Sequence, residues 1–130
     1  MAVGTSQYLN NAWLNTIKST GTSFNVAGSI FVQLHTGSPG SAGTALVSSV
    51  TTRPTITFTS ATTGVLNSSG TASWTSWAGT NGEVVTNVSF WDASSAGNFL
   101  WSATLTASKT VNTGDTLNLT SASLTITNAS

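Results

Sequence analysis

The 130-residue sequence contains no cysteine and very few charged side chains. The missing cysteines exclude disulfides, thiolate metal clusters and a cysteine nucleophile. Three basic and three acidic side chains give a net charge of zero, so no basic cluster exists that could bind nucleic-acid phosphates. Long apolar runs and a signal-peptide pattern are also missing, and we therefore expect synthesis without export and no membrane partner.

The shortage of charge restricts the possible chemistry. A Ser-His-Asp site would have to use His35, the single histidine, with Asp92 or Asp115, and no nucleophile-elbow pattern accompanies them. The compact histidine or cysteine spacings of zinc sites are lacking, and Asp92 with Asn98 lacks the acid-rich loop that calcium needs. We expect no catalytic, cofactor or metal site, with a hydrolase as the weakest alternative. Asp92 is expected to cap its own turn.

Hydroxyl and aromatic side chains are abundant instead. The chain has 21 Ser, 25 Thr and 12 Gly, together with five Trp and five Phe. Disordered chains are poor in aromatic and β-branched residues, so this composition predicts a folded core beneath a surface wetted by hydroxyls. The length suits one domain, residues 1–130. A neutral surface lacks the repulsion that keeps proteins apart, which suits a protein that works in an assembly.

One helix is expected at about residues 6–18, before a β-body at about 28–128. A Ser/Thr cap precedes it, Lys18 ends it and Gly21 follows. Leu9, Trp13 and Ile17 recur at helical spacing, and we expect them to face a supporting surface because so short a helix is unstable alone.

Beyond the helix the hydrophobic period changes to two, the period of strands with one buried face. Short strands separated by turns predict an all-β fold, a single β-sandwich or jelly-roll-like barrel. Pro54 cannot donate a backbone hydrogen bond, so its strand should begin there or lie at an edge. The expected strands cover residues 30–35, 55–59, 72–75, 85–91, 98–105, 116–120 and 123–127.

The aromatic residues supply the candidate functional positions. Residues 90–101 read as a hairpin whose aromatic pairs meet across two strands. Trp74 and Trp77 have two readings, an exposed platform for a sugar or, three times as favoured, ordinary core residues. The candidate core or assembly anchors are Trp13, Leu34, Phe58, Phe90, Trp91, Phe99 and Trp101.

Several segments, taken in order, resemble small virion proteins of tailed bacteriophages that are often labelled tail-fibre proteins. The segments are Val32–Gly40, Arg53–Phe58, Val88–Ala93, Gly97–Trp101 and Val111–Leu117. The sequence departs from that family in Pro54 and in its aromatic middle, Trp74 to Trp77.

The resemblance implies a non-enzymatic structural protein on the exterior of the phage particle, made in the host cytoplasm. We prefer a capsid decoration or minor capsid role, because no fibre repeat or coiled coil is evident. The alternatives are a tail-fibre or baseplate component that helps host attachment, and a carbohydrate-binding module. The expected partners are the major capsid protein or other virion proteins and further copies of the chain, with a host-surface glycan as a possible ligand. Neither nucleic acid nor membrane is expected.

Overall fold

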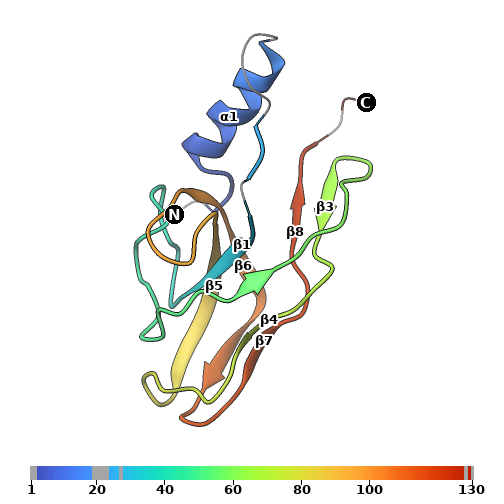
Figure 1. Ribbon diagram of the computed structural model, residues 1–130. Helices are drawn as coiled ribbons and strands as arrows, with labels where there is room; N and C mark the ends of the chain where they lie inside the picture. Colours follow the sequence, from blue (N-terminus) through green and yellow to red (C-terminus); the bar gives the residue numbers. More distant parts are fainter. Residues whose placement is uncertain (1–2, 19–23, 27, 128, 130) are drawn as a thin grey trace.

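The computed structural model describes residues 3–18, 24–26, 28–127 and 129. In this part of the chain one helix precedes a set of strands that do not close into a barrel (Figure 1). The all-β prediction is confirmed in its sandwich form. The predicted domain limits, residues 1 and 130, and Gly21 lie outside the described residues. The elements are α1 (Gln7–Ile17), β1 (Ile30–His35), β2 (Thr55–Ile56), β3 (Val65–Asn67), β4 (Ala72–Trp74), β5 (Glu83–Trp91), β6 (Phe99–Val111), β7 (Leu117–Leu119) and β8 (Ser123–Thr125).

The larger layer is an antiparallel sheet in the order β2-β1-β5-β6. The predicted hairpin joins the central strand β5 to the edge strand β6, with Phe90 opposite Trp101 and Trp91 opposite Phe99. Strand β2 begins directly after Pro54 and lies at the sheet edge, so both predicted consequences of this proline are confirmed. Such a position requires no backbone donor from Pro54, whose carbonyl accepts from Val32 N at 2.9 Å.

The smaller layer consists of two antiparallel strand pairs, β4–β7 and β3–β8. Side chains that alternate along the strands meet between the layers, as expected for a sandwich. The smaller layer contributes three half-buried leucines that pack against the buried core cluster, namely Leu117, Leu119 and Leu124. That cluster includes Val32, Leu34, Ile56, Ala72, Trp74, Val85, Val88, Phe90 and Trp101.

Helix α1 begins at a capping residue and runs away from the sheet (Figure 1). Ser6 accepts a hydrogen bond from Leu9 N at 3.1 Å, which satisfies one free donor of the first turn. Leu9 is buried and Trp13 is half-buried against the core, as predicted. The prediction for Ile17 is wrong, because this side chain is 77% exposed in the last turn of the helix. Among the described residues, no helix has the length and hydropathy needed to cross a membrane.

Candidate functional site

The predicted anchors are distributed over both faces of the large sheet. Phe90 stacks on Trp101 with centroids 4.3 Å apart, and Phe58 meets both rings edge-on at 6.2 and 5.6 Å. Trp91 and Phe99 form a second pair, 5.5 Å apart, on the other face. Leu34 is buried in the main core, and half-buried Trp13 joins that core from the helix. These residues are therefore interior packing groups in this chain.

The candidate aromatic platform is not formed. Trp74 is 4% exposed and Trp77 is 1% exposed, and both belong to the main core. Their ring nitrogens donate to Thr52 O at 2.9 Å and to Thr80 O at 3.2 Å. Trp74 alternates inward on β4, and a turn that contacts the β6–β7 connection encloses Trp77. The exposed-surface hypothesis for these two residues is corrected, and the core reading holds.

His35 lies in a closed polar network on the second face of the sheet. Its Nδ1 is 2.8 Å from Ala45 O, and its Nε2 is 2.7 Å from Ser89 Oγ. Trp91 Nε1 donates to the same hydroxyl oxygen at 2.8 Å. A neutral ring with its proton on Nδ1 satisfies all three groups, because Ser89 then donates to Nε2. His35 and Ser89 are both 0% exposed.

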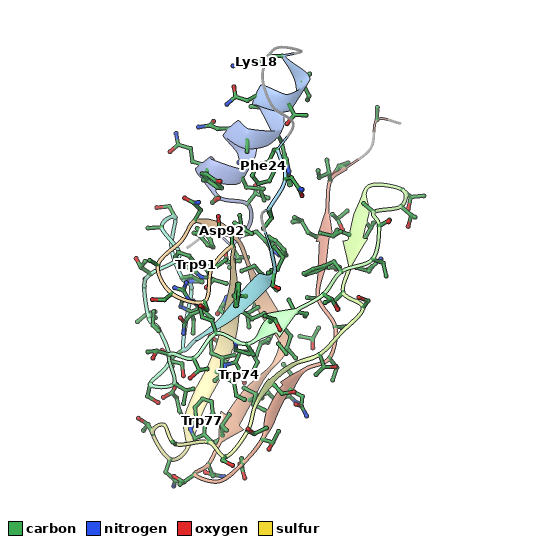
Figure 2. The ribbon with its side chains drawn as sticks, in the orientation of Figure 1. Lys18, Phe24, Trp74, Trp77, Trp91 and Asp92 are labelled. Carbon is green, nitrogen blue, oxygen red and sulfur yellow. The ribbon has the colours of Figure 1, made fainter. Side chains whose placement is uncertain are left out.

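Arg53 covers the Trp91 side of this network. Its guanidinium carbon is 4.0 Å from the centroid of the Trp91 ring, a cation–π distance. Trp91, which ends β5, is labelled in Figure 2. Arg53 Nε donates to Gln33 Oε1 at 3.0 Å, and Nη1 donates to Ala96 O at 2.9 Å. Burial lowers the pKa of this guanidinium. Sequence reasoning missed the arrangement, although Gln33, Ser89 and Trp91 occupy alternate strand positions that point to one face.

The carboxylates serve separate turns. Asp92 Oδ1 accepts from Asn98 N at 2.7 Å, which confirms its predicted cap. Asp115 Oδ2 accepts from Asn112 N at 2.9 Å. Glu83 accepts from Ser49 N, with both carboxylate oxygens 3.2 Å away. The structure brings neither aspartate into the network of His35, and the described residues contain no group of side chains suited to hold a metal ion.

The buried histidine should make stability dependent on pH. Desolvation lowers the pKa of His35 most strongly, the bond to Ala45 opposes this, and the charge of Arg53 lowers it further. The folded pKa thus lies below the unfolded value of 6.5, so the unfolded chain binds more protons between these values. The free energy of unfolding should be level above about pH 7.5 and fall as pH drops below 6.5, by at most about 1.4 kcal/mol per unit. Urea unfolding followed by tryptophan fluorescence at pH 8, 7, 6 and 5 measures this slope.

A His35→Gln variant is the control, because it removes the only histidine. The absolute stability of this variant can differ from that of the native protein. Its free energy of unfolding, however, should change little between pH 6.5 and 5. Partial burial raises the pKa of Glu83 and hydrogen bonds from Ser48 and Ser49 outweigh that effect, so its pKa is lowered. Glu83 therefore loses its contribution only below about pH 4.5. If the free energy of unfolding of the two proteins falls equally with pH, a group other than His35 causes the loss of stability in acid.

An open groove of about 520 Å³ lies between β6 and the β7–β8 region. Its floor includes Leu34, Val88 and Phe90 of the core. Its walls are residues 103–107 and 109 of β6 and residues 117–123 of the β7–β8 region, which are rich in hydroxyls and amides. Lys109 is the one charged side chain in the lining. The groove therefore offers neutral hydrogen-bonding groups and no set of catalytic groups.

A comparison with protein-family models matches residues 4–127, almost the whole chain. The match is to a phage fibre protein, so the chain is a structural component of a bacteriophage virion. The family is described as Podophage GP4 fiber I protein gp80, and the chain belongs to it. The resemblance seen in the ordered sequence segments is thereby confirmed. No curated protein matches the chain.

Proposed function

We propose that this chain is a non-enzymatic structural subunit of the tail-fibre or baseplate apparatus, placed on the outside of the virion. The observation that carries the proposal is the fibre-family match over residues 4–127, which includes α1 and every strand. Sequence reasoning preferred a capsid decoration because no fibre repeat was evident. The family description favours the fibre alternative, since a small β-module can belong to a fibre without carrying the repeat of its shaft.

The interior chemistry supports a structural role. A serine nucleophile needs a base and a path for substrate. Ser89 has His35 as its neighbour, but both side chains are fully enclosed and Trp91 Nε1 also donates to the Ser89 oxygen. The aspartates that could complete a triad bind backbone amides of their own turns. The network therefore stabilises the loops over the sheet and leaves no nucleophile accessible.

The surface supports assembly with other virion proteins and with further copies. Only 5% of residues are charged, so contacts must form through hydroxyls, amides and exposed apolar side chains. Such contacts are individually weak, and repetition on one particle makes attachment strong. The neutral surface also disfavours nucleic acid, whose binding depends on basic clusters.

Immunogold electron microscopy of intact particles tests this placement. Antibodies raised against the chain are applied to whole virions and, as controls, to separately prepared heads and tails. Label restricted to tails is the expected result. Label distributed over heads would replace the fibre proposal with capsid decoration, and a chain with no accessible epitope on either part would overturn the exterior placement.

A further inference from the structure

The groove beside β6 combines exposed hydroxyls with half-buried aliphatic side chains. Its volume of about 520 Å³ lies within the range of about 300–1,000 Å³ that is typical of ligand sites. Residues 103–107 and 109 of β6 form one wall, and residues 117–123 form the other. Trp74, which ends β4 and is labelled in Figure 2, also lines this space. We call it the hydroxyl groove.

Both walls of the hydroxyl groove alternate in polarity. On β6, half-buried Leu105 lies between exposed Thr104 and Thr106. On β7, exposed Asn118 lies between two half-buried leucines. Each wall therefore presents hydrogen-bonding groups next to hydrocarbon surface, and a ligand that matches the groove must carry both kinds of surface close together.

The fold leaves most of the wall hydroxyls unused. Four exposed lining residues have side-chain hydroxyls that bond to no other described residue, namely Thr106, Thr120, Ser121 and Ser123. The Oδ1 atom of Asn118 accepts from Ser73 Oγ at 2.7 Å, so its amide NH₂ can still donate. A hydroxyl donates one hydrogen bond and accepts two. The groove thus offers both donors and acceptors to a ligand.

The scarcity of charge narrows the class of ligand. Lys109 is the only charged side chain among the described residues that line the groove. One cation is too few to hold a polyanion, whose binding depends on clustered basic groups. A cationic ligand would find no counter-charge in the same lining. The groove is therefore suited to a neutral ligand.

The path of β6 disfavours an extended peptide as that ligand. The pairing of β6 with β5 breaks after Thr104 and resumes at Lys109, so residues 105–108 form a bulge in this edge strand. A peptide that adds to a sheet edge uses a regular row of backbone donors and acceptors, and a bulge interrupts that row. Recognition in the groove must then depend on the side chains of its walls.

We propose that the hydroxyl groove binds a neutral oligosaccharide, a role that goes beyond the structural function proposed above. Sugar rings carry hydroxyls around their edge and C–H groups on their faces, so they match walls in which hydroxyls alternate with leucines. One copy should bind with a dissociation constant on the order of 1 mM, because an open groove leaves part of the ligand in water. Repetition of the chain on one particle makes the overall attachment strong.

A nuclear magnetic resonance titration of the isotope-labelled chain tests this site. The probes are neutral oligosaccharides of glucose, galactose, mannose and rhamnose, each added up to about ten times the expected dissociation constant. At least one probe should shift the backbone amide signals of residues 103–109 and 117–123. The signals of residues 37–49, which cover the other face of the large sheet, should not change. No shift with any probe, or shifts confined to other residues, overturns the proposal.

Removal of two wall hydroxyls identifies the contact. A Thr106→Val/Thr120→Val chain keeps the side-chain shapes but loses one hydroxyl from each wall, so it should bind the active probe at least about tenfold more weakly. The matched control is Thr110→Val/Thr125→Val, whose residues are exposed on β6 and β8 outside the groove and whose binding should equal that of the native chain. Thermal unfolding verifies that both variants are folded. Equal affinities in the two variants contradict the assignment.

Assembled particles distinguish a saccharide site from a contact with another virion protein. The native chain has no cysteine, so Thr106→Cys places a unique thiol in the wall. In intact virions this thiol should react with a small thiol-specific label, because the groove is open to solvent. Cross-linking of the thiol to a neighbouring protein would show that a protein segment fills the groove and would overturn the proposal. Immunogold labelling judges the tail placement independently.

Discussion

Replacing Phe90 by alanine is expected to lower the free energy of unfolding by about 3–5 kcal/mol. Phe90 is fully buried near the end of β5, stacked on Trp101 and in edge contact with Phe58. Its truncation removes apolar burial and leaves a cavity between the two layers, because the surrounding side chains relax only partly into the space. Urea unfolding followed by far-UV circular dichroism measures the loss.

Val84→Ala is the matched control for that experiment. Val84 lies in the same strand but is exposed, so its truncation should cost less than about 1 kcal/mol. Comparable losses in the two variants would mean that stability follows β-propensity along β5 and not the aromatic cluster. The expected difference therefore tests whether the interlayer core dominates the stability of this sandwich.

Trp77→Ala should also destabilise the protein by about 3–5 kcal/mol, although Trp77 lies in no strand. The ring is almost fully buried and its Nε1 donates to Thr80 O. Two backbone hydrogen bonds hold the segment around it. Trp77 N donates to Asp115 O and Gly114 N donates to Trp77 O, both at 2.9 Å. Thermal and urea unfolding measure the effect.

The Trp77→Phe variant separates packing from hydrogen bonding. Phenylalanine keeps much of the ring volume but cannot donate to Thr80 O, so about 1–2 kcal/mol should be lost. If the free energy of unfolding of the Trp77→Ala protein lies within about 0.5 kcal/mol of the native value, the Trp77 ring behaves as an exposed side chain. That outcome would restore the sugar-platform reading that the burial of Trp77 excludes.

Local signals in the sequence were sufficient for several elements. Ser6 before the helix, the alternation from Ile30 to His35, and the turn between Phe90 and Trp101 each depend on residues close together in the chain. The same holds for Asp92, whose carboxylate caps its own hairpin turn. These features were predicted because their physical cause acts over a few residues.

Pairing between distant segments explains the predictions that failed or were missing. Strand β3 is only three residues long and exists because Leu66 pairs with Leu124 of β8. Strand β6 continues past its predicted end at residue 105, because Glu83 to Val85 pair with its last three residues beyond a bulge. Exposed residues 106–110 carry no alternation that could have revealed this extension. Ile17 follows the helical period, but the β-body ends before it.

The sequence by itself determined the all-β class, the capped helix, the aromatic hairpin and, through its ordered segments, the bacteriophage resemblance. Composition and short-range periodicity carry that information, because they record which residues are buried and where the chain turns. Only the tertiary structure decided that Trp74 and Trp77 are enclosed, that His35 and Ser89 share a buried network, and that Ile17 at the end of α1 is exposed. Those outcomes depend on which distant segments cover each face, and burial of a side chain is a property of its neighbours in space.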